Sequence, residues 1–331
     1  MLVLNQSDVE RMLTMPKCIE LMTQTLSALA RGEATLPLRT VFGIPDGAFA
    51  VMPAALANPS TVGAKLITVL PKNHGTKYDS HQGAVLLFDT GNGSLLSVMD
   101  ASSITQIRTA AASGVATNAL AKKSATSLGI LGAGVQGQSH LDAMMAVRPI
   151  KTVKIWSRNG ASAEKLAKHA RDRYGVDAKA VPTAKDASTN TDIICTCTSS
   201  TEPVLFGEWL SPGAHVNAVG SSQNHAREID SATVVRSRLY VDRRESALKE
   251  PGDIVTPIKN GEITPDHIVG EVGEVLIGKA PGRRSDDEIT LFKSLGIAIE
   301  DIASAHYLYA EAKRQGAGVE VELGGTRHDA H

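Results

Sequence analysis

Three glycines with the spacing G-x-G-x-x-G, at Gly132, Gly134 and Gly137, form the pattern of this chain that points most directly to chemistry. They follow the apolar run 127–131 and precede the segment 135–147, which has the pattern of a helix. In such a unit the first glycine makes a tight turn, the second lets a pyrophosphate approach the backbone, and the third lets the helix pack closely. The helix N-terminus supplies free N–H groups to the phosphates. The motif predicts a dinucleotide site, and the alternative is a glycine-rich turn without a ligand.

The end of the next strand indicates which dinucleotide would bind. The segment 152–157 ends in Ser157-Arg158-Asn159, and no carboxylate stands there to accept a hydrogen bond from a ribose 2′-hydroxyl. The Arg158 guanidinium can instead pair with a 2′-phosphate in a forked geometry. We therefore predict that NADP(H) is preferred and that NAD(H) is possible. Alternatively, Arg158 stacks on the adenine and accepts either cofactor.

Three cations of the N-terminal third, Arg39, Lys65 and Arg108, lie in apolar surroundings. Such side chains are rarely buried without a partner. Two arginines could clamp a substrate carboxylate, and a lysine could donate a proton. His81 precedes a strand pattern and could line the same cleft. The alternative for each cation is an ordinary surface charge, and for His81 a structural role.

The elements that must position these residues fall into two kinds. Before residue 105, strand patterns joined by turns predict an antiparallel meander, and Ser7 is expected to cap a helix that ends at Met12. After residue 122, strands alternate with helices, which is typical of a doubly wound parallel sheet. The fold class is therefore α/β, with a Rossmann-type doubly wound parallel sheet and an additional α+β domain. The expected strands are 39–42, 48–52, 63–70, 84–88, 94–99, 126–131, 152–157, 178–181, 192–198, 214–220 and 238–242.

The change of pattern predicts two domains. Residues 1–118 would form a substrate-binding and dimerisation domain, with 300–331 packing back on it, and residues 119–299 would form the dinucleotide-binding domain. A helix is expected at 297–314, and the tail from Gly316 is expected to be loosely ordered.

Composition excludes several classes of protein. Lys and Arg number 34 and Asp and Glu number 35, and aromatic residues make up 4%, so neither a basic face nor a stacking platform for nucleic acid is expected. No apolar run has the length of a membrane helix, and the first residues lack a signal-peptide pattern, so we expect a cytoplasmic protein. Cys195 and Cys197 have no second pair of ligands nearby, so no metal is expected.

Taken together, these segments resemble the ornithine cyclodeaminase/mu-crystallin family over residues 2–314. The segments 206–209 and 247–253 are most similar to its mu-crystallin branch. The matching segments are VMPA (51–54), AKL (64–66), SHQ (80–82), VMD (98–100), RTAA (108–111), GILGAGVQ (129–136), SR (157–158), TEP (201–203), PGAHVNAVG (212–220) and FKSLG (292–296).

The resemblance implies a homodimer, formed through the first domain, whose substrate pocket is lined by Arg39, Lys65 and Arg108. These three are the predicted catalytic residues. The motif and the resemblance together give the predicted cofactor-binding residues Ser80, His81, Arg108, Gly132, Ala133, Gly134, Val135, Gln136, Ser157, Arg158, Asn159, Thr198, Val219 and Ser294.

One departure from the family pattern affects the expected reaction. Cyclodeaminases carry an Asp at the position of Ser222, and a serine cannot replace a carboxylate base near neutral pH. The resemblance therefore implies NAD(P)H-dependent reduction of a cyclic ketimine, Δ1-pyrroline-2-carboxylate or Δ1-piperideine-2-carboxylate, to L-proline or L-pipecolate. The alternatives are an alanine or other amino-acid dehydrogenase, an ornithine cyclodeaminase, and a non-catalytic protein that binds NADPH and a small effector.

Overall fold

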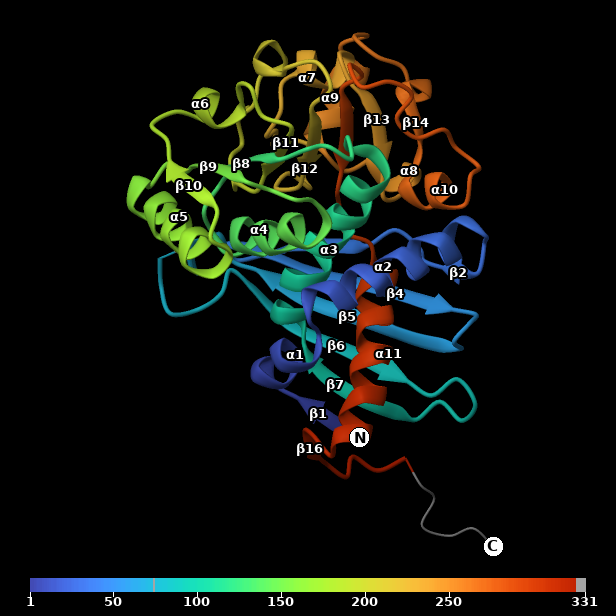
Figure 1. Cartoon of the computed structure of the whole chain (residues 1–331). Coiled ribbons are helices and arrows are strands. Elements are labelled where there is room, and N and C mark those ends of the chain that lie inside the picture. Colours follow the sequence, from blue (N-terminus) through green and yellow to red (C-terminus); the bar gives the residue numbers. More distant parts are fainter. Residues whose placement is uncertain (74, 326–331) are drawn as a thin grey trace, which may run out of the picture. The chain divides into compact units, whose positions relative to one another are not determined.

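The computed structural model describes residues 1–73 and 75–325, which form two compact units (Figure 1). The first unit contains residues 1–21, 31–108 and the tail from Ile297, and the second contains residues 22–30 and 109–296. Residues 109–118, which the sequence assigned to the first domain, thus pack with the second unit, as does 22–30. The last part of the predicted 300–331 segment, 326–331, lies outside the described residues.

The first unit is an antiparallel meander extended at both edges. Its sheet has the order β16-β1-β7-β6-β5-β4-β2, and β3 also pairs with β4. Helix α11 packs against β4 and β5, which lie side by side in Figure 1. The elements are β1 (Leu2–Leu4), α1 (Gln6–Met12), β2 (Ala34–Thr35), β3 (Thr40–Ile44), β4 (Gly47–Leu56), β5 (Thr61–Val69), η1 (Pro71–Asn73), β6 (His81–Phe88), β7 (Leu95–Asp100), α11 (Ala298–Gln315) and β16 (Val319–Glu320).

Strand β5 shows how the sequence positions a cation in this unit. Its burial alternates, so that Thr61, Gly63, Lys65 and Ile67 face the interior. A Cβ atom on Gly63 would lie 2.8 Å from the side chain of Ile302, because α11 crosses the strand closely there. The lysine therefore occupies a core position of the sheet.

The second unit is the doubly wound parallel sheet that the sequence predicts. Its strand order is β10-β9-β8-β11-β12-β15-β13-β14, and all the strand pairs are parallel. Helices α2 (Met15–Ala30) and α3 (Ala101–Leu120) each begin in the first unit and end in the second. The other elements are β8 (Ser127–Leu131), α4 (Val135–Val147), β9 (Thr152–Trp156), α5 (Gly160–Tyr174), β10 (Asp177–Ala180), α6 (Ala184–Ser188), β11 (Ile193–Thr196), η2 (Gly207–Trp209), β12 (His215–Ala218), α7 (Ser231–Val235), β13 (Arg238–Val241), α8 (Arg244–Ala247), α9 (Gly252–Lys259), η3 (Pro265–His267), β14 (Ile268–Glu271), α10 (Val272–Leu276) and β15 (Thr290–Lys293).

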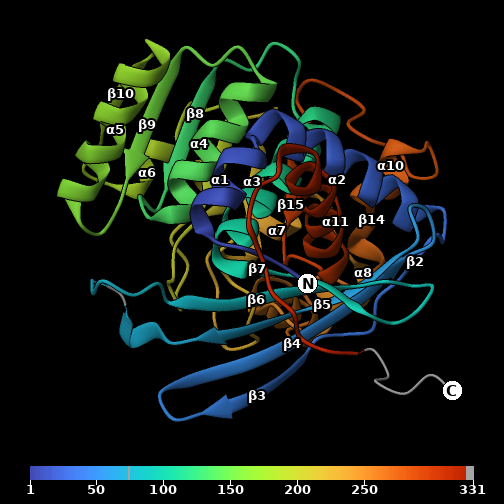
Figure 2. The same ribbon diagram turned by 90° about the horizontal axis from the view of Figure 1, so that it is seen from below.

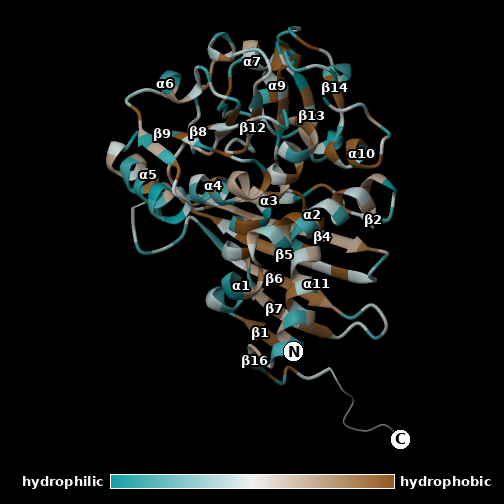
Figure 3. Cartoon of the chain, viewed as in Figure 1, coloured by the Kyte–Doolittle hydropathy of each residue, from teal (hydrophilic) through white to brown (hydrophobic). Residues whose placement is uncertain are grey.

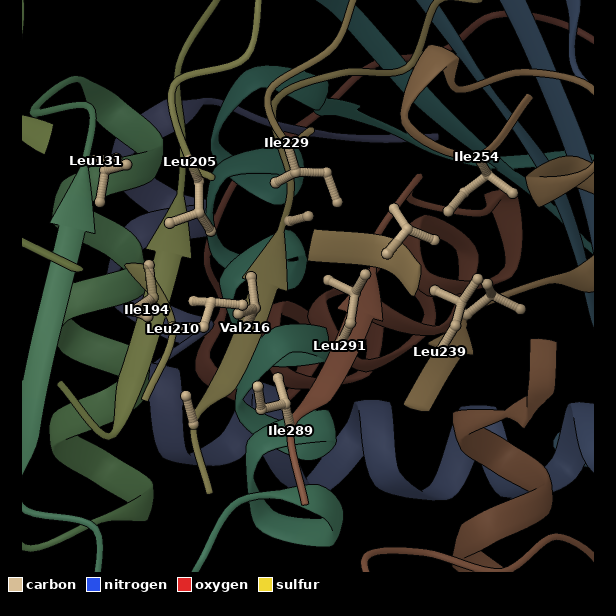
Figure 4. Close-up of a cluster of buried hydrophobic side chains, with 14 of the residues drawn as sticks. Leu131, Ile194, Leu205, Leu210, Val216, Ile229, Leu239, Ile254, Ile289 and Leu291 are labelled. Atoms are coloured by element: carbon tan, nitrogen blue, oxygen red, sulfur yellow. The ribbon is translucent and has the colours of Figure 1, made fainter. Parts of the chain in front are cut away.

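The core of the second unit lies on these short apolar strands. Leu131, Ile194, Val216 and Leu291 come from four neighbouring strands and pack with Ile229 in one buried cluster (Figure 4). Helix α5 lies at the surface and is largely hydrophilic (Figure 3). Burial on both faces explains why the central strands β8, β11, β12 and β15 show no alternation, whereas β9 and β10, at one side of the sheet, do alternate.

Two predictions about local structure were wrong, and several strands were missed. Asn5, not Ser7, caps α1, because its side chain accepts from Asp8 N and the Asp8 side chain accepts from Asn5 N. The segment after Gly316 is not wholly irregular, since β16 pairs with β1 in antiparallel register. Strands β1, β2, β14 and β15 were not among the expected strands. No helix among residues 1–73 and 75–325 is long and apolar enough to span a membrane.

Candidate active site

The glycine-rich turn between β8 and α4 has the geometry that its sequence demands. Gly132 has a φ of +106°, and a Cβ atom there would lie 2.4 Å from the Cys197 carbonyl oxygen. A Cβ atom on Gly137 would meet the Gly132 carbonyl oxygen, so the helix packs directly on the turn. Nothing lies within 4 Å of the Cβ position of Gly134, which caps α4 without a side-chain hydrogen bond. This open helix N-terminus fits a pyrophosphate.

Two predicted cofactor-binding residues carry buried polar atoms that lack a partner. Gln136 Oε1, in the first turn of α4, and Ser294 Oγ, directly after β15, have no hydrogen-bond partner among the described residues. Val135, beside Gln136, is 53% exposed, and Ala133 is half-buried. Buried polar atoms are normally paired, so these two atoms, at the edge where a dinucleotide is predicted, fit donors or acceptors of that cofactor.

The residues after β9 differ in their exposure. Ser157 is half-buried and Arg158 is exposed. Asn159 has a structural role, because its Oδ1 accepts from Ala161 N at 3.1 Å and caps α5. A cofactor contact by Asn159 therefore remains a prediction that competes with a visible capping role.

Thr198, Val219 and Ser294 follow the carboxyl ends of β11, β12 and β15, which are neighbours in the sheet. Ligands of open α/β sheets bind outside this edge. The predicted cofactor-binding residues of the second unit are thus brought to one edge. Among the described residues, no cluster of three or more His, Cys, Asp or Glu side chains could hold a metal ion.

In the first unit the structure brings Lys65 and Arg108 together on two carboxylates. Lys65 Nζ lies 2.9 Å from Asp301 Oδ2 and 3.3 Å from Thr105 Oγ1. Arg108 donates from Nε to Asp301 Oδ1 at 2.9 Å and from Nη1 to Glu300 Oε2 at 2.7 Å. The lysine is 2% exposed and the arginine 3% exposed, while both carboxylates are fully buried. We call Lys65, Arg108, Glu300 and Asp301 the cation site.

Burial, together with the neighbouring Arg108, lowers the pKa of Lys65 to about 8, although Asp301 acts in the opposite direction. The half-buried Arg39 is close enough to lower that pKa further. A lysine with such a pKa is charged at neutral pH and still gives up its proton readily. The Nη2 group of Arg108 takes no part in the bonds to Glu300 and Asp301, so it leaves two N–H donors for a ligand.

Ser80 and His81 lie at the start of β6. The Ser80 Oγ and the His81 Nδ1 are 2.9 Å apart, and the His81 carbonyl accepts from Ser102 Oγ. His81 is exposed and pairs across the sheet with Val69, whereas Lys65 pairs with Val85, four residues further along β6.

Glu300 and Asp301 were not predicted as site residues. The sequence does carry a signal for them, because two adjacent carboxylates interrupt an apolar segment between Ile299 and Ile302 at the start of α11. Carboxylates in such a setting need buried partners.

Comparison with known proteins identifies the family of this chain over nearly its whole length. The model of the ornithine cyclodeaminase/mu-crystallin family matches residues 1–316. The chain belongs to this family. It is 41% identical to the ketimine reductase mu-crystallin of Mus musculus over 280 residues, which are 84% of this chain and 85% of that protein.

Solved structures that resemble this chain have the same fold. The Thermococcus litoralis Δ1-pyrroline-2-carboxylate reductase, in complex with NADH and L-proline, superimposes with a TM-score of 0.95 at 38% identity, covering 97% of this chain and all of that one. An archaeal alanine dehydrogenase dimer with bound NAD gives 0.93 at 31% identity, covering 98% and 99%. The predicted family and fold class are confirmed, and the chain is an NAD(P)H-dependent oxidoreductase of this family.

Proposed function

We propose that this family member reduces a cyclic ketimine carboxylate, Δ1-pyrroline-2-carboxylate or Δ1-piperideine-2-carboxylate, to L-proline or L-pipecolate. The observation that carries the proposal is the buried cation site, where a lysine and an arginine share Asp301 and keep donors available. Similarity to the two reductases supports the substrate class.

The substrate carboxylate would be held by Arg108, through Nη2, and by Arg39. Charge-assisted bonds from a planar guanidinium fix both the position and the orientation of a carboxylate. Asp301 and Glu300 hold the Arg108 side chain from the other side, so the guanidinium is ordered before the substrate arrives.

The proton would come from Lys65. When bound, a reduced nicotinamide supplies the hydride that adds to the imine carbon of the substrate. The ring nitrogen gains the Lys65 proton, or keeps its own proton in a hydrogen bond to Lys65, and the C=N bond becomes CH–NH. Thr105 and Asp301 keep the lysine Nζ in place.

For the cofactor we propose a preference for NADP(H), with NAD(H) still accepted. Gly134, Gln136 and Ser294 would hold the dinucleotide, since their open space and unpaired buried atoms fit it. The exposed Arg158 supports the 2′-phosphate contact.

We also propose a homodimer, formed through the first unit. Strand β3 lies at the outer edge of its sheet (Figure 2) and exposes Val41 and Phe42, each at 53%. The centroid of the Phe42 ring lies 5.4 Å from that of the half-buried Phe49 on β4, so an aromatic pair marks this edge of the sheet. Sedimentation of F42D as a monomer, beside a dimeric wild type, is the expected result.

The deciding experiment is oxidation of NADPH in the presence of each cyclic imine, with NADH and pyruvate plus ammonia in parallel. Rapid turnover of an imine with NADPH is expected. Turnover of pyruvate and ammonia alone would instead assign the chain to the alanine dehydrogenases, which the similarity to the archaeal enzyme makes the second candidate. Cofactor binding without any turnover would point to a binding protein.

A further inference from the structure

Glu228 is a fully buried carboxylate at the carboxyl edge of the second sheet, outside every predicted site. Its Oε2 accepts from Thr196 Oγ1 at 2.8 Å and from Gly220 N. Its Oε1 accepts from both the N–H and the hydroxyl of Thr198. One carboxylate therefore ties the ends of β11 and β12 to each other.

The link continues to a third strand through Asp253, in the first turn of α9. Asp253 Oδ1 accepts from the backbone N–H groups of Glu228 and Ile229, at 2.8 and 3.1 Å. Its Oδ2 forms an ion pair with Lys293 Nζ at 2.9 Å, and Lys293 is the last residue of β15. Glu228, Asp253 and Lys293, which we call the edge network, are all fully buried.

A fully buried charged network is an unfavourable way to hold a sheet together if it has no other role. Burial of charged groups costs free energy that their pairing rarely recovers in full. Burial also raises the pKa of Glu228, an effect that Lys293 opposes. At the opposite edge of the sheet, the partly exposed Asp192 ties β8 to β11 by accepting from Thr126 N and Ser127 N. A less buried carboxylate is thus sufficient for a structural tie.

Each strand end that the edge network holds carries a predicted cofactor contact. Thr198 is bound directly by Glu228, Val219 adjoins Gly220, and Ser294 adjoins Lys293. Gly220 is also packed so tightly that a Cβ atom would lie 2.6 Å from the Glu228 carboxyl carbon.

We infer that Glu228 is a positioning residue for the cofactor: it fixes the loops after β11 and β12 in the arrangement that receives the nicotinamide end of the dinucleotide. The inference rests on the proposed function only in assuming that this edge binds a nicotinamide dinucleotide. Holding the loops in place before binding removes an ordering cost that would otherwise weaken affinity.

The substitution E228Q tests this role with almost no change of shape. An amide has only one acceptor oxygen, so its NH2 group must face either the Thr198 N–H or the Gly220 N–H, and one loop loses its anchor. The matched control is D192N, which makes the same change to a carboxylate that accepts backbone N–H groups at the other edge. T196V is a milder variant that removes one hydroxyl donor and leaves Glu228 intact.

The measurement is the NADPH dissociation constant of each purified variant by fluorescence titration, together with its thermal midpoint. We expect E228Q to raise the constant about tenfold and T196V to raise it about threefold. D192N should lower the midpoint while its constant stays within about twofold of wild type.

An unchanged dissociation constant in folded E228Q and T196V, with a lowered midpoint, would overturn the inference and leave a purely structural network. If E228Q does not fold, T196V alone decides the question. A wild type that binds neither NADPH nor NADH would overturn the inference as well. A wild type that binds NADPH but reduces no imine would overturn the proposed substrate alone, and the dissociation constants would still decide the role of Glu228.

Discussion

The cation site of the first unit and the edge network of the second are both buried clusters of charge, but they differ in sign and in what their polar atoms bind. In the cation site, Lys65 and Arg108 face two carboxylates, the positive Arg39 lies nearby, and Arg108 keeps donors that neither carboxylate uses. In the edge network, two carboxylates face one lysine, and both oxygens of Glu228 are occupied by donors of the chain itself. Buried charge thus serves two different purposes in this molecule. An arginine with unused donors is suited to binding an anion, whereas a carboxylate whose two oxygens are already bound by the chain is suited to holding backbone.

The substitution K65M should have the largest effect on activity. Since Lys65 is the proposed proton donor, we expect kcat for imine reduction to fall about 10²–10⁴-fold, while the NADPH dissociation constant stays unchanged. Arg108 still neutralises Asp301, so the variant should fold. Steady-state kinetics and fluorescence titration measure the two quantities. A kcat close to that of wild type would remove Lys65 from the mechanism.

D301N tests whether the cation site is held by its shared carboxylate. It leaves Lys65 without its ion-pair partner and takes one of two carboxylates from Arg108, so we expect the free energy of unfolding to fall by about 3–5 kcal/mol. Denaturant titration measures this loss. E33Q is the control, since it breaks an exposed pair with Arg31 and should lower the free energy of unfolding far less than D301N does. Equal losses in the two variants would contradict the proposed arrangement.

The pH dependence of reduction sharpens the assignment of Lys65. Only the protonated lysine can donate, and its pKa is lowered to about 8. The rate should therefore be constant below that value and fall about tenfold per pH unit above it. Because Asp301 raises this pKa, the falling limb should move to lower pH in D301N. A profile that stays flat from pH 7 to about 10 would show that another group supplies the proton.

Arg158 is the proposed contact to the 2′-phosphate on the adenosine ribose of the cofactor, and its substitution should have a smaller effect. R158Q removes the proposed partner of the 2′-phosphate, so we expect the dissociation constant for NADPH to rise about tenfold and that for NADH to change less than about twofold. K165Q, on the neighbouring helix α5, is a charge-matched control. Parallel losses for both dinucleotides would favour stacking of Arg158 on the adenine.

Features that depend on a few neighbouring residues can be predicted from the sequence of this molecule. The glycine spacing implies the open turn before α4, and the apolar settings of Lys65 and Arg108 imply burial, because each inference depends on a few neighbouring residues. The partners of those cations could not be assigned in the same way. Arg108 and Asp301 are 193 residues apart, and only the packing of α11 on the sheet brings them together.

The order of the strands in the second sheet could not be predicted from the sequence either. Strand β15 lies between β12 and β13, although it comes last of the three along the chain. The segment is short and apolar like its neighbours, so its hydrophobic pattern does not indicate which strands it pairs with. The edge network could not be predicted for the same reason. Lys293 reaches the other charged residues of the network only because β15 lies beside β12.

The position of α11 at the end of the chain has a consequence for synthesis. The carboxylates that neutralise Lys65 and Arg108 belong to residues 300 and 301, so they leave the ribosome after all residues of the second unit, which ends at Gly296. Until then the β5 lysine has no counter-charge, and burying it would be unfavourable. The unit that begins the chain is therefore completed last, and the nucleotide-binding unit can fold first during translation.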